Sequence, residues 1–126
     1  MKLARLVDER LHSALTKLSK EALPLKIAFR LKGITKLVNE EYTKYDEVRK
    51  EALKRHGKYS SEGDLITNEQ GNVELSPEGM QAFLLELSEL ANMEIDCPTI
   101  KISELGDNIC LTLQDVEMLD GIVIED

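Results

Sequence analysis

Residues 23–57 read LPLKIAFRLKGITKLVNEEYTKYDEVRKEALKRHG, and this stretch decides the fold. Its apolar residues recur every three or four positions from Ile27 to Ala52, which is the period of an amphipathic helix. Pro24 disfavours helical geometry in the residue before it and suits the first turn of a new helix, so the helix begins at this corner. A helix of some 32 residues spans roughly 48 Å at about 1.5 Å per residue. We therefore expect part of it to project from the compact core of so short a chain.

The segment before Pro24 has the same helical period. Its apolar residues are Leu3, Leu6, Val7, Leu11, Leu15, Leu18 and Ala22. This spacing predicts one helix over residues 3–22, joined to the long helix by a tight turn. The first 56 residues are thus predicted to form a long antiparallel helical hairpin.

Residues 57–75 differ in character, since they hold three glycines and two short apolar pieces. They predict a β-hairpin at the tip of the helical arm, with its turn at residues 68–71, where Gly71 can adopt a positive φ. Ser76-Pro77-Glu78 is typical of a helix start, and it predicts a third helix over residues 76–92. We detect no internal repeat in the chain.

From residue 93 onward the apolar period becomes two, which predicts a small C-terminal β-hairpin. Thr112 is followed three residues later by Asp115, as in a capping box, so a short helix over residues 113–119, closed by Gly121, is the alternative. The fold class is therefore α+β. The single predicted domain, residues 1–126, comprises the basic helical hairpin (1–56), the first β-hairpin (57–75), the third helix (76–92) and an acidic tail of β-structure or short helix (93–126).

Charge is divided unevenly along the chain, which has 126 residues and a net charge of −8. Residues 1–58 hold 15 Lys+Arg and 8 Asp+Glu, or +7, whereas residues 59–126 hold one base and 16 acids, or −15. In one interpretation the basic half folds onto the acidic half and each screens the other. In the other, part of the basic face stays open to an anionic partner, or the acidic half imitates nucleic acid in a basic groove of another protein. Direct binding to nucleic acid is not expected at −8, because phosphate contacts dominate such affinity.

No motif for catalysis, nucleotide binding or metal coordination occurs in the sequence. His12 and His56 lie on different predicted helices and belong to no zinc-binding pattern. Cys97 and Cys110 have neither CxxC spacing nor a nearby histidine, and we expect both to be small buried residues on strands. We therefore predict a protein that is not an enzyme and uses no metal or cofactor.

Two sets of residues on the long helix are candidates for binding. Basic residues crowd its first turns, where the helix dipole does not favour cations, and these anion-binding candidates are Lys26, Arg30, Lys32 and Lys36. The partner-binding candidates Tyr42, Tyr45 and Val48 lie on the apolar stripe. A homodimer through that stripe would cover apolar surface that the rest of the chain is too short to bury.

Several pieces of the sequence carry a resemblance to a known family. These are the Leu23-Pro24-Leu25-Lys26-Ile27-Ala28 corner, Arg49 and Leu53 before Gly57, the Gly71-Asn72-Val73 turn, Phe83 with Glu86-Leu87 and Glu89-Leu90, and Leu105-Gly106-Asp107. With them the chain resembles a family of short, uncharacterised bacteriophage and prophage proteins. The resemblance implies a phage-encoded protein in the cytoplasm of a bacterial host or in the virion, and it transfers no catalytic residue.

Together these features predict a non-enzymatic accessory protein that binds a phage or host protein, in virion or tail assembly or as an assembly chaperone. The alternative is a host-takeover or anti-defence inhibitor, either an acidic decoy of a nucleic-acid-binding protein or a sponge for a small nucleotide on the basic cluster. The first ten residues carry charges where a signal peptide would be apolar, and no uncharged run approaches the roughly 18 residues of a membrane span. Neither secretion nor a membrane is expected.

Overall fold

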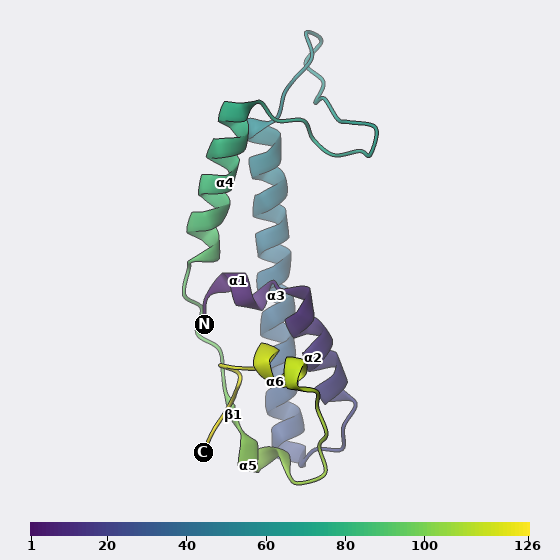
Figure 1. The fold of residues 1–126 in the computed structure, drawn as a ribbon, viewed down its shortest axis with the longest axis vertical. Coiled ribbons are helices and arrows are strands. Elements are labelled where there is room, and N and C mark those ends of the chain that lie inside the picture. Colours follow the sequence, from purple (N-terminus) through teal and green to yellow (C-terminus); the bar gives the residue numbers. More distant parts are fainter. The chain divides into compact units, whose positions relative to one another are not determined.

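The computed structural model describes residues 1–126 and contains six helices and two short strands (Figure 1). In chain order the elements are α1 (Leu3–Leu6), α2 (Glu9–Ser19), α3 (Leu25–His56), α4 (Pro77–Ala91), β1 (Ile100–Lys101), α5 (Ile102–Leu105), α6 (Leu113–Met118) and β2 (Val123–Ile124). The fold thus combines helices with one two-stranded parallel sheet. The chain divides into two compact units, unit 1 (Met1–Tyr42 and Glu94–Asp126) and unit 2 (Thr43–Met93).

The long helix α3 is confirmed over 32 residues, and it begins directly after Pro24. The amides of Ile27 and Ala28 both donate to the Pro24 carbonyl at 2.9 Å, which closes the first turn. The last turn carries Lys54, Arg55 and His56. The positive charges of Lys54 and Arg55 complement the negative end of the helix dipole.

The single helix predicted over residues 3–22 is wrong in one respect, because it is broken into α1 and α2 at Val7 and Asp8. Asp8 has an extended backbone, and its carboxylate accepts a hydrogen bond from the Arg10 amide at 2.9 Å. A short acidic side chain competes in this way for backbone donors and favours the N-cap over the helix interior. Helix α2 therefore starts afresh at Glu9, and it ends at Ser19 rather than at Ala22.

In unit 1, α2 packs antiparallel to the first part of α3 (Figure 1). The rings of His12 and Tyr42 meet edge to face with centroids 5.4 Å apart, and Ser19 and Thr35 line a common cavity of about 110 Å³. The core of this unit draws residues from both ends of the chain. Its largest fully buried side chains are Leu6, Leu11, Leu18, Ile34, Val38, Ile100, Leu119 and Ile122.

The C-terminal β-hairpin predicted from the period of two is wrong. Ile100 pairs with Val123 and Lys101 with Ile124, so β1 and β2 are parallel and 21 residues of other structure separate them. The preceding extended segment pairs with the N-terminus, where Ile95 and Met1 exchange backbone hydrogen bonds at 2.8 and 3.0 Å. An alternating pattern shows only that a segment is extended with one face buried, and it does not name the partner strand.

The alternative helix near residue 113 is confirmed as α6. The Thr112 hydroxyl caps it by accepting a hydrogen bond from the Asp115 amide at 3.1 Å. Gly121 has a φ of +89° in the turn that follows and leads the chain back to β2. At the start of the segment that connects β1 to β2, the Glu104 carboxylate accepts a hydrogen bond from the Lys101 amide at 3.0 Å, and α5 begins immediately after β1.

Unit 2 pairs the last part of α3 with α4. The predicted start of α4 is confirmed, since the Ser76 hydroxyl accepts from the Gly79 amide at 3.0 Å and Pro77 is the first helical residue. Ala52 on α3 and Phe83 on α4 are buried. Arg55 donates to both carboxylate oxygens of Glu86 at 3.1 and 3.0 Å.

Between these helices lie three successive eight-residue repeats, so the expectation of no internal repeat is wrong. The repeats are HGKYSSEG (56–63), DLITNEQG (64–71) and NVELSPEG (72–79). The third residues of the repeats form a closed cycle of backbone hydrogen bonds. The Ile66 amide donates to the Lys58 carbonyl at 2.8 Å, the Glu74 amide to Ile66 at 3.0 Å, and the Lys58 amide to Glu74 at 2.9 Å.

The turns of the repeats are equivalent as well. Gly63 donates to Ser60 and Gly71 to Asn68, each at 3.0 Å through the backbone, and both glycines have a positive φ. In the third repeat the first turn of α4 takes the place of this turn. The residues predicted as one hairpin therefore form a three-membered ring of isolated antiparallel bridges.

Candidate protein-binding site

Ion pairs join the basic and acidic halves of the chain. Lys17 pairs with Asp115 and Arg30 with Glu104 in unit 1, and Arg55 pairs with Glu86 in unit 2. Unit 1 holds 10 Lys+Arg and 14 Asp+Glu, and unit 2 holds 6 and 10, so each unit has a net charge of −4. This is the arrangement of the first interpretation, in which the two halves screen each other.

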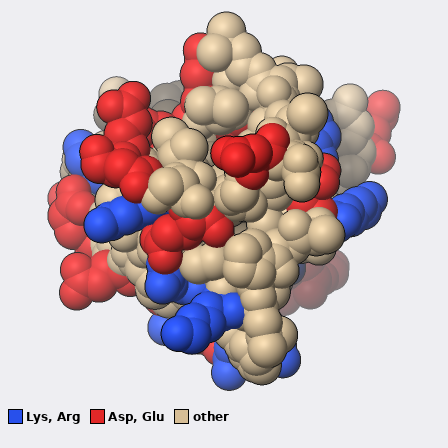
Figure 2. All heavy atoms as spheres, turned by 90° about the horizontal axis from the view of Figure 1, so that it is seen from below, with Lys and Arg blue, Asp and Glu red and all other residues tan.

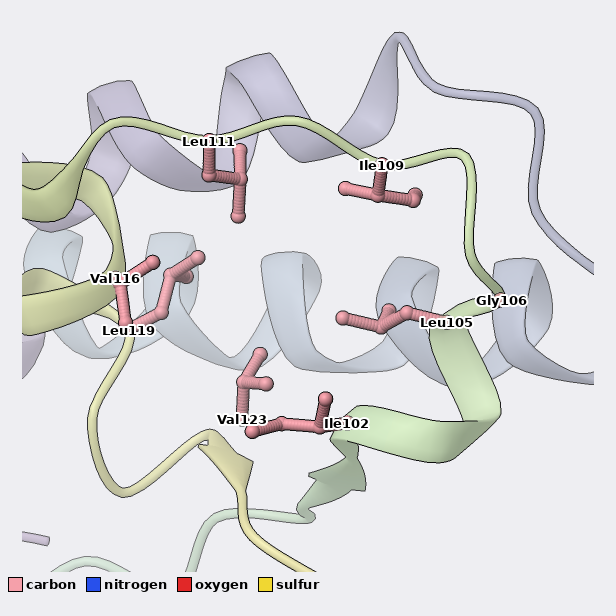
Figure 3. A pocket seen from close by; sticks show the side chains of 8 residues that line it. All are labelled: Ile102, Leu105, Gly106, Ile109, Leu111, Val116, Leu119 and Val123. Carbon is pink, nitrogen blue, oxygen red and sulfur yellow. The ribbon is translucent and has the colours of Figure 1, made fainter.

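Unit 1 contains an open apolar pocket of about 280 Å³ (Figure 3). Residues from α5, α6, β2 and the loop between the two helices line it, namely Ile102, Leu105, Gly106, Ile109, Leu111, Val116, Leu119 and Val123. Leu105 and Leu119 are buried, whereas Ile102 and Val116 are 50% and 51% exposed. Figure 3 shows the side chains converging on one space from all sides. No polar or charged side chain lines it.

The local sequence explains how the pocket forms. Gly106, with a φ of +86°, ends α5, and Thr112 caps the start of α6, so the residues between them form a loop without helix or strand. In this loop Ile109 and Leu111 line the pocket while Cys110 is exposed. The alternation that predicted a strand here instead reflects residues that alternately line the pocket and face solvent.

Two contacts from the N-terminal helices hold α6 in place. Lys17 on α2 binds the Asp115 carboxylate, and the Arg5 guanidinium donates to the carbonyl oxygens of Glu117 and Met118 at 3.2 and 3.3 Å. Burial raises the pKa of Asp115, but hydrogen bonds from Thr112 and Lys17 outweigh it, and the net pKa lies below its usual value. The carboxylate is thus charged at neutral pH.

The segment that lines the pocket is acidic. Residues 102–126 contain seven acids and no Lys or Arg. Three of the acids have partners, because Glu104 binds Arg30, Asp115 binds Lys17 and Asp126 accepts from Ser103. The other four form neither an ion pair nor a side-chain hydrogen bond, and they are Asp107, Glu117, Asp120 and Glu125. In the sequence, the first three of these directly follow the pocket-lining residues Gly106, Val116 and Leu119, and we call Asp107, Glu117 and Asp120 the acidic rim.

The four predicted anion-binding residues have different partners. Arg30 donates to both carboxylate oxygens of Glu104, at 3.0 and 2.9 Å. The hydrogen bond from the Lys101 amide and those from Arg30 hold the pKa of Glu104 below its usual value. Lys36 lies 4.0 Å from Glu40, while Lys26 and Lys32 form no ion pair. Arg30 is therefore committed to a partner within the chain, and only the lysines remain open to an external one.

The outer face of α3 combines these lysines with exposed apolar residues. Leu25 and Phe29 are 74% and 66% exposed, and with Lys32 and Lys36 they follow steps of four, three and four along one side of the helix. Seen from below (Figure 2), Lys and Arg gather along the lower edge around an uncharged area, while Asp and Glu lie mainly to the left and above. We call Leu25, Lys26, Phe29, Lys32 and Lys36 the basic face of α3.

The predicted partner-binding residues Tyr42, Tyr45 and Val48 are divided between the two units. Tyr42 belongs to unit 1, is partly exposed and contacts His12. Tyr45 is half-buried and Val48 is exposed, both in unit 2. They do not line the pocket.

The histidines and cysteines lie outside the pocket lining. His12 Nε2 lies 2.9 Å from the Leu6 carbonyl oxygen, His56 Nε2 lies 3.0 Å from Glu86, and no group of three or more His, Cys, Asp or Glu side chains is placed to hold a metal ion. The expectation of two buried cysteines on strands is wrong, because Cys110 is exposed and neither cysteine lies in a strand. Cys97 is half-buried, and this burial raises its pKa.

Comparisons with protein-family models, curated proteins and solved structures found no match for this chain. None of its helices has the length and apolar character needed to cross a membrane. The pocket was not predicted from the sequence. Its signal was the uncharged run from Asn108 to Gln114, which stands between acidic residues.

Proposed function

We propose that this protein is a non-enzymatic binding protein whose pocket holds an apolar, basic segment of a protein partner. The observation that carries the proposal is an open pocket lined by apolar side chains, within a segment that carries four carboxylates without an ion pair. Apolar side chains of the partner would remove Ile102 and Val116 from water, which is the main source of affinity in such grooves. Lys or Arg beside those side chains would face Asp107, Glu117 and Asp120 and would set specificity and orientation.

The chemistry of the pocket argues against a small polar ligand. No polar or charged side chain in its lining could orient one, and about 280 Å³ lies just below the range for small-molecule sites. An amphipathic helix or an extended segment with two large apolar side chains suits it better.

The resemblance to bacteriophage and prophage proteins supports a role in the infected bacterial cell. There we propose that the protein binds a phage protein during virion or tail assembly, as a component or as a chaperone, in the host cytoplasm or in the virion. A chaperone of this kind would cover an apolar, basic segment of the partner until assembly buries it.

An anti-defence inhibitor remains the second candidate. The seven acids without a base in residues 102–126 favour an acidic decoy for a host protein that binds nucleic acid. The nucleotide sponge has less support, since Arg30, central to its predicted anion site, is bound to Glu104.

The first experiment captures partners from infected host cells with the tagged protein and then tests each one purified. The pocket variant Val116→Glu places a charge at the mouth of the pocket, and Leu85→Glu, at an exposed position of α4 in unit 2, is the matched control. The proposal expects a phage protein that binds the wild type and Leu85→Glu directly and loses binding to Val116→Glu. A host nucleic-acid-binding protein with the same dependence would support the decoy. Partners that bind all three forms equally would overturn the pocket as the site.

A second experiment needs no identified partner. Cys110 lies between two pocket-lining residues and is exposed, so it can carry an environment-sensitive dye in a Cys97→Ser background. The probe is a synthetic helical peptide with Leu and Phe four positions apart and lysines around them, and its acidic counterpart is the control. We expect the dye to respond to the basic peptide only, less at high salt and not in Val116→Glu. Equal responses to both peptides would contradict a role for the acidic rim.

A further inference from the structure

We propose that the segment that enters the pocket is the basic face of α3 from a second copy of this chain, so that copies associate head to tail. This inference rests on the proposed function of the pocket and names its occupant. Both surfaces lie within unit 1.

The basic face of α3 has the chemistry that the pocket requires. Leu25 and Phe29 are two large apolar side chains one helical turn apart, and no part of their own chain buries them. Lys26 and Lys32, which flank them, form no ion pair. Exposed apolar side chains grouped with unpaired charge of one sign are typical of a contact surface.

The charges of the two surfaces are complementary. The basic face carries Lys26, Lys32 and Lys36 and no acidic residue, while the segment that lines the pocket carries four carboxylates without an ion pair. Insertion of Leu25 and Phe29 into the pocket would bring lysines of one copy near Asp107, Glu117 and Asp120 of the next. Each surface thus supplies the apolar contact and the counter-charges that the other lacks.

Two other exposed apolar segments lack this combination. Leu84 and Leu85 on α4 are exposed, but that helix contains no Lys or Arg. Val48 has basic neighbours, yet Arg49 and Lys50 are both paired with Asp46.

The two surfaces point to opposite sides of unit 1. In Figure 3 the ribbons of α2 and α3 lie behind the pocket. Ile27, Leu31 and Ile34 of α3 are buried, and Leu25 and Phe29 lie on the reverse side of the helix. A copy cannot fill its own pocket, and two copies joined in this way leave one free surface at each end. Such a contact is heterologous and generates a ring or a filament rather than a closed dimer.

The test measures assembly of the full chain by light scattering after size exclusion and by sedimentation. Two variants disable one surface each. Phe29→Glu disables the basic face, and Val116→Glu disables the pocket. Both positions are exposed, and thermal melting by circular dichroism checks that each variant folds. We expect the wild type to form species larger than dimers as its concentration rises. Each variant alone should associate at least about 30-fold more weakly than the wild type, as when an interface loses an anchor residue.

The decisive sample is the equimolar mixture of the two variants. It contains one intact basic face and one intact pocket, so we expect dimers and nothing larger. Leu85→Glu should assemble like the wild type. A monomeric wild type at the highest soluble concentration, variants that assemble normally, or a mixture that stays monomeric would overturn the proposal.

If Phe29→Glu fails to fold, the pair Lys26→Glu and Lys32→Glu replaces it. Assembly lost in that double variant should return on mixing with a pocket in which Asp107 and Glu117 are changed to Lys. The peptide experiment separates the two proposals. A monomeric protein whose Cys110 dye responds to the basic peptide overturns head-to-tail assembly and leaves the pocket as a binding site, whereas a monomer without a response overturns both.

Discussion

Lys17 on α2 places its Nζ 3.2 Å from each carboxylate oxygen of Asp115 on α6, across 98 residues of sequence. Asp115 is 7% exposed and is the one buried charged residue of the chain. Its neighbour Val116 forms part of the pocket mouth. The ion pair therefore fixes one wall of the pocket to the basic half of the protein, and it couples the stability of unit 1 to the shape of the candidate site.

Replacement of Asp115 by Asn should destabilise the protein at neutral pH, because Lys17 loses its charged partner. Asn keeps the shape of the side chain, so the variant removes the charge alone. The pKa of Asp115 in the folded state lies below its usual value of 3.8. A carboxyl group with a lowered pKa stabilises the fold above its unfolded pKa, and this contribution is lost as the pH falls through the folded pKa. The measurement is urea unfolding of the wild type and Asp115→Asn at neutral pH and near pH 3.

The difference between these two proteins should shrink in acid. The control is Asp107→Asn, which removes an exposed acid without an ion pair and should leave stability unchanged at both pH values. A difference between wild type and Asp115→Asn that persists in acid would show that the ion pair is not its origin.

The break between α1 and α2 gives a second prediction. The Asp8 carboxylate caps α2 through the Arg10 amide, and one of its oxygens lies 2.9 Å from the Arg10 guanidinium. Asp8→Ala should cost about 1 kcal/mol of stability, the usual effect of losing an N-cap. Asp8→Asn keeps the cap and should cost less. Equal losses in the two variants, measured by urea unfolding, would assign the effect to the charge pair with Arg10 instead.

The structure shows why some elements could be predicted from the sequence and others could not. Helices α3 and α4 have strong local signals, Pro24 and a long apolar stripe for α3, and Ser76-Pro77 for α4. The signals at Asp8 and Thr112 are equally local, but a single cap competes with a periodic pattern that runs past it. The pairing of β1 with β2, like that of Met1 with Ile95, depends on tertiary packing, which no local pattern encodes.

The candidate site illustrates the same limit. The lysines on α3 could be singled out from the sequence, but Arg30 could not be separated from them, because its partner Glu104 is 74 residues away. The pocket takes its walls from two helices of four and six residues, a loop and a two-residue strand. Elements this short leave no clear periodic signal.

Two glycines should respond in opposite directions to the same substitution. A Cβ on Gly33 would meet no atom within 4 Å, and Gly33 lies inside α3, so Gly33→Ala should raise the free energy of unfolding by about 1 kcal/mol. Gly71 also has open space around it, but its φ is +81°, so Gly71→Ala should lower it by roughly 1 kcal/mol. Urea unfolding of both variants checks the pair. A loss of stability in Gly33→Ala would indicate that the backbone at that point is not regular helix.

Gly57 tests the three-membered ring of unit 2. It occupies the position that Leu65 and Val73 hold in the other two repeats. A Cβ on Gly57 would lie 2.8 Å from the methyl groups of both residues and 2.9 Å from the Leu53 carbonyl oxygen, which belongs to the backbone of α3 and cannot turn aside. The centre of the ring therefore has room for two side chains but not for three. Gly57→Ala should cost about 1–3 kcal/mol, as overpacking of a core does.

The loss should be confined to unit 2. Hydrogen exchange should accelerate at the amides of Lys58, Ile66 and Glu74, which close the cycle, while the amides of unit 1 keep their protection. Gly63→Ala is the comparison. A Cβ on Gly63 would meet no atom, so the positive φ is the only source of strain, and we expect this variant to lose less stability than Gly57→Ala. If Gly57→Ala leaves the exchange of these three amides unchanged, the ring is not closed in solution, and the three repeats behave as independent turns.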